Sequence, residues 1–279
     1  MRAGAVIMKR ERPDAFAIFT NNADDSAVLE AANFDFDFAA GLDFTLERRF
    51  GECSALQVRY FGIDGWAADQ AGAFPASGRL NAALPISFNG FNAFESSYNS
   101  ELFSTEVNWK HQTFCDLAFL AGFRYLELNE DLRTRITGPP GTALHNINTD
   151  NRMYGFQLGA DGRLWSCERF ALNGLLKAGV FYNAARHGAV IEFPPANPVF
   201  GPMNQPGSHA AFLGEFALTG AYELREGWRL HAGYQVMWVN GVALAGDQTP
   251  VTNFGAETGI DASGDAFYHG AMFALEIEW

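Results

Sequence analysis

The chain has 279 residues, with 19 basic and 32 acidic side chains, and its formal net charge is −13. An acidic balance without basic clusters argues against nucleic-acid binding, and an aromatic content of 14% argues against disorder. No run of about 20 apolar residues occurs, which excludes a transmembrane helix. The remaining classes are a soluble all-β or α/β protein and a membrane β-barrel, whose strands alternate apolar and polar residues.

Alternation with a period of two is the dominant pattern along the chain. The segment FDFDFAAGLDFTLE at 34–47 places its phenylalanines on one face and its acidic residues on the other, which is typical of a strand. The segments 152–164, 228–240 and 266–279 alternate in the same way, although His269 interrupts the apolar face of the last. In chain order, we predict strands at 3–9, 34–47, 54–63, 100–110, 116–126, 152–164, 170–183, 211–223, 228–240 and 266–279.

The connections between these strands indicate the architecture. Connections of roughly 24–36 residues alternate with connections of roughly 4–6, as in outer-membrane barrels with long outer loops and short periplasmic turns. The sequence therefore predicts an all-β fold: a single domain over 1–279 that forms a ten-stranded antiparallel up-and-down transmembrane β-barrel. The alternative is a soluble ligand-binding barrel with its apolar faces turned inward.

The polar faces of the strands would point into the lumen. A barrel of ten strands is narrow, so we expect a structural protein or at most a narrow passive pore for ions and small solutes, with cations favoured by the acidic excess. Tryptophans near the predicted strand ends, Trp66 among them, suit aromatic girdles. The pore-lining candidates, assigned by parity, are Asp35, Asp37, Asp43, Glu47, Arg59, Glu106, Arg124, Asp161, Arg163, Lys177, Glu215, Arg229, Glu276 and Glu278.

Motifs for catalysis are missing from the sequence. It has no G-x-S-x-G, P-loop or H-E-x-x-H pattern, and we predict no enzyme activity, no cofactor and no metal site. His231 is predicted to point inward, whereas His145, His187 and His209 fall in predicted outer loops. The pair Asp24-Asp25 keeps one alternative open, an outer-membrane enzyme with its site at the outer rim.

The three cysteines share one feature. Cys53, Cys115 and Cys167 fall in short turns, which places all three on the predicted periplasmic rim. An odd number leaves at least one thiol free or paired with another chain. We therefore predict a disulfide to an envelope partner or within a homo-oligomer.

Two stretches, LEAANFDFDFAAGLDFTLERRFGECSALQVRYFGIDGW at 29–66 and LAFLAGFRYLELNEDL at 117–132, resemble the outer-membrane β-barrel proteins of planctomycete bacteria. That family is loosely similar to bacterial major outer membrane proteins. The resemblance implies a barrel in the outer membrane, with lipid and the barrel-insertion machinery as partners, the latter through the alternating C-terminal strand AMFALEIEW. It implies no catalytic residues. Residues 1–30 contain no signal peptide, from which we expect a processed or truncated chain.

Overall fold

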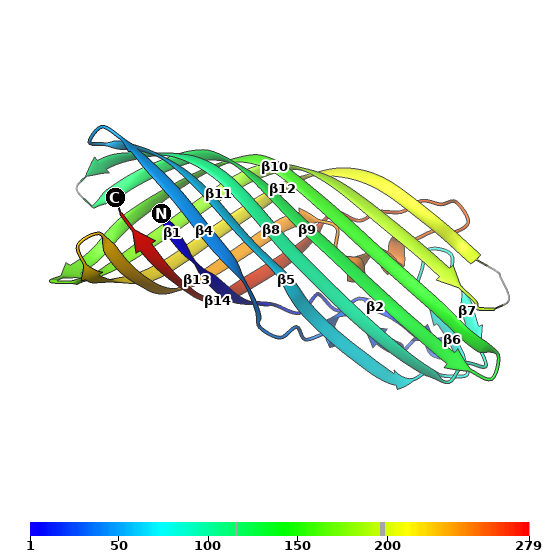
Figure 1. Ribbon diagram of the computed structural model, residues 1–279. Coiled ribbons are helices and arrows are strands. Elements are labelled where there is room, and N and C mark those ends of the chain that lie inside the picture. The colour runs from blue at the N-terminus through cyan, green and yellow to red at the C-terminus, as the bar shows by residue number, and fades with distance from the viewer. Residues whose placement is uncertain (115, 196–198, 279) are drawn as a thin grey trace.

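The computed structural model describes residues 1–114, 116–195 and 199–278. Ten antiparallel strands close into a barrel in the order β1-β14-β13-β12-β11-β10-β9-β8-β5-β4 (Figure 1). The strands are β1 (Arg2–Arg10), β4 (Ala39–Phe50), β5 (Ser54–Ala73), β8 (Ala93–Phe114), β9 (Leu117–Gly138), β10 (Gly141–Cys167), β11 (Phe170–Glu192), β12 (Val199–Arg225), β13 (Trp228–Val242) and β14 (Gly264–Ile277). The predicted ten-stranded antiparallel barrel is confirmed.

The short turns predicted from the sequence, β4–β5, β8–β9, β10–β11 and β12–β13, lie at one end of the barrel, which we call the turn rim, together with both chain ends (Figure 1). Gly51 and Gly227 adopt φ values of 68° and 76° in two of these turns, a left-handed conformation that favours glycine. The opposite end, the mouth, differs from the prediction. The segments predicted as long loops at 127–151 and 184–210 are mostly strand, because β9 and β10 continue to a tight turn beyond Gly138.

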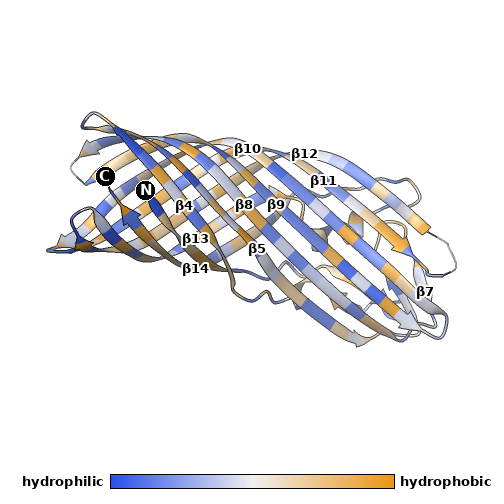
Figure 2. Ribbon diagram, in the orientation of Figure 1, coloured by the Kyte–Doolittle hydropathy of each residue, from blue (hydrophilic) through white to orange (hydrophobic). Residues whose placement is uncertain are grey.

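The outward faces of the strands change character along their length. Near the turn rim they are apolar and exposed, as at Leu42 (70%) and Phe156 (73%), and Figure 2 shows hydrophobic and hydrophilic residues alternating there. Outward positions of β9 become polar after Tyr125, and those of β10 are polar from Asn146 to Arg152. These two tyrosine rings are in contact, with centroids 5.0 Å apart. The apolar parts, 117–125 and 154–164, match the roughly 9–11 residues with which a tilted strand spans a bilayer.

The strand predicted at 34–47 begins later than expected, because residues 34–38 lie outside β4, which starts at Ala39. Phe34 and Phe36 are fully buried and pack edge-on against Tyr98 at 5.4 and 5.2 Å, so they face the interior of the mouth rather than lipid. Trp66 is also buried, and its indole Nε1 donates to the carbonyl of Met8 at 2.8 Å. It therefore does not belong to a girdle.

A folded cap covers the mouth. Its sheet has the order β3-β2-β6-β7, from β2 (Ala17–Asn21), β3 (Ala27–Glu30), β6 (Ser77–Leu80) and β7 (Ser87–Asn89). Two 3-10 helices, η1 (Ala31–Asn33) and η2 (Ala245–Val251), complete it. Phe19 lies at the centre of an aromatic cluster and contacts the rings of Phe74 and Phe88 at 5.6 and 5.7 Å.

No helix in the described part of the chain has both the length and the apolar character needed to cross a membrane.

Candidate functional site in the barrel interior

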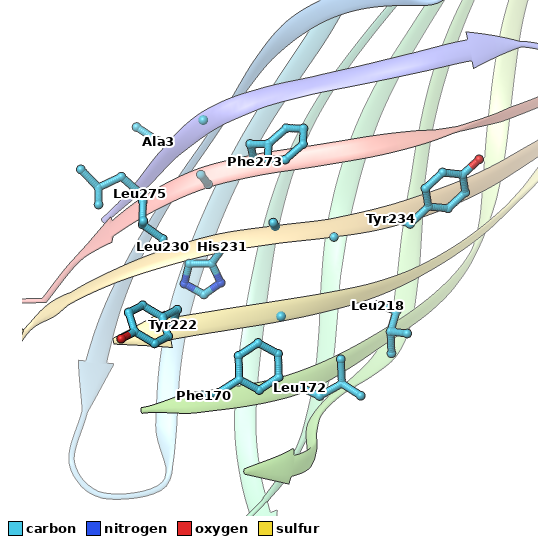
Figure 3. A pocket seen from close by; sticks show the side chains of 15 residues that line it. Ala3, Phe170, Leu172, Leu218, Tyr222, Leu230, His231, Tyr234, Phe273 and Leu275 are labelled. Carbon is cyan, nitrogen blue, oxygen red and sulfur yellow. The ribbon is translucent and has the colours of Figure 1, made fainter. Parts of the chain in front are cut away.

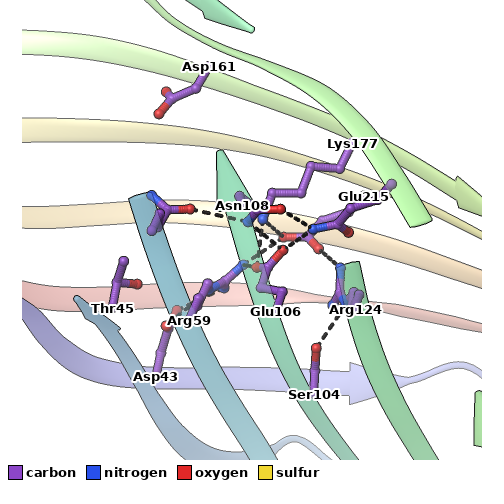
Figure 4. Close-up of polar contacts among 12 residues, drawn as sticks. Asp43, Thr45, Arg59, Ser104, Glu106, Asn108, Arg124, Asp161, Lys177 and Glu215 are labelled. Carbon is purple, nitrogen blue, oxygen red and sulfur yellow. Dashed lines mark hydrogen bonds and ion pairs between the residues drawn. The ribbon is translucent and has the colours of Figure 1, made fainter. Parts of the chain in front are cut away.

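A buried ion-pair network crosses the lumen within the lipid-facing part of the barrel (Figure 4). Glu215 on β12 accepts from Arg59 at 2.7 Å and from Arg124 at 2.5 Å. Lys177 on β11 donates to Glu106 on β8 at 2.7 Å. All five side chains are at most 2% exposed. Strands on opposite sides of the barrel are thereby joined through its centre.

Further groups complete this central network. Asp43 accepts from Arg59 at 3.1 and 2.8 Å, and Glu106 also accepts from Asn108 at 3.1 Å and from Gln157. Three cations therefore face three carboxylates. Buried charges are tolerated when they are paired and hydrogen-bonded, and this balance explains how such a set is stable inside the wall. The parity of the sequence predicted all six charged members, and the structure brings them together.

An apolar layer lies on the mouth side of the network. Phe61 lies beneath the guanidinium groups of Arg59 and Arg124, at 5.2 and 5.6 Å from its ring centre. Beyond it come fully buried aliphatic side chains from β8, β9 and β13, such as Leu102, Leu128 and Val239. Two successive layers of buried side chains therefore lie across the lumen, first the paired charges and then the aliphatic residues.

On the other side of the network, an open vestibule of about 1000 Å³ reaches the turn rim. Lys110 on its wall lies 3.1 Å from Glu47 and 2.8 Å from Asp161. At the rim, Arg229 pairs with Glu276 at 3.0 Å and with Glu278 at 3.3 Å. These predicted residues therefore border a water-accessible space that ends at the central network. Lys110 is not among the predicted lining residues, although it shares the parity of Glu106.

Two predicted lining residues lie outside the lumen, and a third lies only at its edge. Asp35 and Asp37 precede β4 and are exposed outside the barrel, because the chain there runs along the cap with its phenylalanines inward. Asp35 instead pairs with Lys9 at 2.8 Å and with Arg12 at 2.6 Å. Arg163 borders the vestibule only at its edge, half exposed and 3.6 Å from Asp116.

A second buried polar cluster, the mouth cluster, was missed because its segments were predicted as loops. Arg10 pairs with Glu130 at 2.5 Å, and both side chains are at most 1% exposed. Glu130 accepts from the backbone N–H of Ala245, and the hydroxyl of Tyr98 accepts from that of Gly246 at 3.2 Å. These contacts hold η2 in the mouth of the barrel.

Asp247 on η2 is the uncompensated member of the mouth cluster. Its carboxyl is buried, and within the described part of the chain Oδ1 has no hydrogen-bond partner. Burial, together with the nearby charges of Glu130 and Asp261, raises the pKa of Asp247 to about 7. A carboxyl in this position keeps its proton at mildly acidic pH.

The histidines and acidic residues considered for chemistry lie apart. His145 and His187 are buried on strands, which corrects their predicted place in loops, and His209 is exposed on β12. His231 points inward, as predicted, 3.0 Å from Glu276. Asp24 accepts from Ser26, and Asp25 pairs with Arg79. No three His, Cys, Asp or Glu side chains among the described residues form a set suited to a metal ion.

Cys53 and Cys167 are free and exposed at the turn rim, whereas Cys115 lies outside the described residues, as does Trp279 at the end of the predicted last strand. The two described thiols stand on turns separated by β8 and β9. Three strand steps correspond to roughly 14 Å along the wall, more than the roughly 7 Å that a disulfide allows between Cα atoms. They therefore cannot pair within one barrel.

Comparison with solved structures agrees with this architecture. The outer membrane protease OmpT of Escherichia coli superposes with a TM-score of 0.54 at 11% sequence identity, covering 100% of this chain and 96% of that one. The toluene transporter TodX of Pseudomonas putida gives a TM-score of 0.38 at 9% identity, covering 99% and 89%. No protein-family model matches the sequence. No curated protein matches it either. The chain therefore has the fold of an outer-membrane β-barrel.

Proposed function

We propose that this protein is a structural component of a bacterial outer membrane, with a closed lumen and a folded cap at the outer surface. The observation that carries the proposal is the central network, in which Arg59, Arg124 and Lys177 are neutralised inside the bilayer-spanning wall by three carboxylates. An ion crossing here would have to displace charge-assisted hydrogen bonds and then enter an aliphatic layer, and both steps are costly.

The membrane location rests on the exposed apolar belt. Exposed apolar surface of this extent would be unfavourable in water, and it ends at a ring contact between Tyr125 and Tyr154, where outward residues become polar. The cap at the opposite end from the short turns then faces the outside. Membership of the planctomycete outer-membrane barrel family, and insertion through the C-terminal strand, are part of this proposal.

Planar-bilayer recording tests the closed lumen. Folded protein, identified by heat-modifiable gel migration, should give no steady conductance in bilayers where a known porin added afterwards conducts. Steady, cation-selective steps from the folded protein would contradict the proposal. They would support the runner-up function, a narrow passive pore, which the vestibule open to the turn rim favours.

We also propose that the protein is not an enzyme. In support, Asp24 accepts a hydrogen bond from Ser26 and Asp25 pairs with Arg79, and among the residues that the structure describes neither carboxylate is paired with a histidine. A screen of lipid and peptide hydrolysis by the wild type and by the Asp24→Asn and Asp25→Asn variants tests this. Hydrolysis by the wild type that either variant abolishes would establish the outer-rim enzyme instead.

A disulfide-linked envelope partner or second copy remains our proposal for the turn rim. Cys53 and Cys167 are exposed there and are too far apart to pair with each other. Membranes prepared without reductant should show a higher-mass band that disappears on reduction and in the Cys53→Ser/Cys167→Ser variant. Identical migration with and without reductant would rule out the linkage.

A further inference from the structure

Two buried polar side chains of β13 border the vestibule, and each has a nitrogen without a partner. Gln235 is 1% exposed; its Oε1 accepts from Arg59 at 3.1 Å, whereas its Nε2 has no hydrogen-bond partner among the described residues. His231, nearer the turn rim (Figure 3), is 8% exposed. Its Nε2 lies 3.0 Å from Glu276, and its Nδ1 is unpartnered within the same part of the chain. Buried polar groups are nearly always hydrogen-bonded, so these nitrogens indicate a polar guest in the vestibule.

Arg2 on β1 differs from the paired cations of the vestibule wall. Lys110 and Arg229 each lie within 3.3 Å of two carboxylates. Arg2 has no carboxylate within ion-pair distance in the described part of the chain, and its Nη2 makes only a long contact, 3.4 Å, to the hydroxyl of Thr45. Its positive charge is therefore available to an anion that enters from the turn rim.

The pairing of β1 with β4 places Arg2 close to Gln235. Arg2 is directly opposite Thr45, and the next inward residue of β4 towards the mouth is Asp43. Asp43 accepts from Arg59, and Arg59 also donates to Gln235. The Arg2 guanidinium thus stands one inward position nearer the turn rim than the groups that hold Gln235, on the open side of the central network.

The wall beside these donors is apolar. Ala217 on β12 pairs with Gln235 and with Leu175 on β11, and Met272 is the next inward residue of β14 on the turn-rim side of Gly270, which also pairs with Gln235. Ala217, Leu175 and Met272 all border the vestibule. On its lipid-facing side the same wall carries the apolar groove drawn in Figure 3. A ligand that reaches the two donors would therefore lie against hydrocarbon.

We propose that the vestibule binds a small organic carboxylate with a short hydrocarbon body, which enters through the turn rim. The carboxylate would accept from Nε2 of Gln235 and from the guanidinium of Arg2, and the hydrocarbon would pack on Ala217 and Met272. Hydrogen bonds to an ionised acceptor are about twice as strong as neutral ones, which favours a carboxylate over the corresponding amide. The inference goes beyond the proposed structural role, because it gives the open end of the lumen a ligand.

Titration calorimetry and ligand-observed NMR on the folded barrel in detergent test the site with butyrate. Butyramide and inorganic phosphate are the comparison solutes. Gln235→Glu keeps the size of the side chain and an acceptor for Arg59, and it replaces the free Nε2 by an oxygen that repels a carboxylate. Arg2→Gln removes the unpaired charge. Its matched control is Arg225→Gln, because Arg225 also lies at the turn rim but stacks on Trp228 at 4.4 Å, away from the vestibule lining.

Wild type and Arg225→Gln should bind butyrate one to one. Gln235→Glu should bind it at least about tenfold more weakly and Arg2→Gln about threefold more weakly, because each loses a hydrogen bond to a charged group. Butyramide and phosphate should bind the wild type at least about fivefold more weakly than butyrate. No binding of butyrate to the folded wild type, undiminished binding by Gln235→Glu, or tighter binding of either comparison solute would overturn the proposal.

Heat-modifiable migration of each variant is measured first, so that loss of the fold is not mistaken for loss of binding. If Gln235→Glu does not fold, the comparison of Arg2→Gln with Arg225→Gln decides, and equal affinities of these two variants would overturn the proposal.

Discussion

The central network and the mouth cluster both bury an arginine–glutamate pair at 2.5 Å, Arg124–Glu215 in one and Arg10–Glu130 in the other. They differ in charge balance. The central network pairs three cations with three carboxylates, whereas the mouth cluster adds Asp247 to an already neutral pair. The comparison indicates that positive and negative side chains are equal in number in the central network, whereas the mouth cluster contains one more carboxyl group, Asp247, than its arginine can pair with.

The largest effect is expected from breaking the central network. Glu215→Gln would leave Arg59 and Arg124 buried without their shared carboxylate. Removing one partner of a buried ion pair costs about 3–5 kcal/mol, so the urea midpoint in detergent should fall strongly. Glu95→Gln on exposed β8 surface is the control and should change stability by less than about 0.5 kcal/mol. A Glu215→Gln barrel as stable as the wild type would mean that water or rearrangement compensates the arginines.

Removal of the Asp247 charge should increase stability, whereas removal of the Glu215 charge should decrease it. In the unfolded chain Asp247 ionises near 3.8, whereas in the folded chain it holds its proton to about 7. Stability should therefore fall as pH rises from about 4 to about 7 and then stay constant, by up to about 4 kcal/mol over roughly three pH units. Asp247→Asn, which cannot ionise, should be more stable than wild type at pH 8 and equal to it at pH 4.

Limited proteolysis of residues 243–263, the segment that contains η2, measures how the local stability around Asp247 changes with pH. Cleavage of the wild type should increase between pH 5 and pH 8, while Asp247→Asn should remain resistant throughout. Matching pH profiles for the two proteins would show that Asp247 is not the titrating group.

The same comparison explains what could be predicted from sequence. In the spanning half, each strand has polar or charged residues facing the lumen and apolar residues facing lipid. Alternation alone therefore predicts that Arg59, Glu106 and Glu215 point inward. It could not say which of them pair, because the partners come from strands far apart in sequence and meet only through barrel closure, as Arg59 and Glu215 do.

In the capped half, that rule fails because there is no lipid. Phe34 and Phe36 keep their alternation with Asp35, but their apolar side meets Tyr98 inside the mouth. Strand extensions such as β9 after Tyr125 carry polar residues outward and Leu128 or Glu130 inward, a pattern that resembles a loop composition when read locally. The mouth cluster was missed for this reason.

A smaller loss of stability is expected from breaking the hydrogen bonds that hold Ala243, just before η2, in the mouth. Asn151 donates to the carbonyl of Ala243 at 2.8 Å and accepts from its N–H at 2.7 Å, all within a buried site. Asn151→Leu leaves both backbone groups unpaired, at about 1–3 kcal/mol. Hydrogen exchange should increase in residues 243–252 and leave β12 unchanged, whereas Asn99→Leu, at an exposed site, should change neither.

The smallest effect is expected at Asp35, on the surface of the capped half. Hydrogen bonds from Arg12 and then Lys9 lower the pKa of this carboxyl below its ordinary value. The stability that these ion pairs contribute is therefore fully present above about pH 4 and is lost progressively as pH falls below that value. Because the group is exposed and screened by salt, Asp35→Asn should leave the thermal midpoint at pH 7 unchanged within error at 0.15 M salt, with a small decrease only at low ionic strength. A large decrease in the thermal midpoint would mean that the ion pairs hold the segment before β4 against the mouth. We expect burial of Phe34 and Phe36 to hold it instead, because both rings are fully buried.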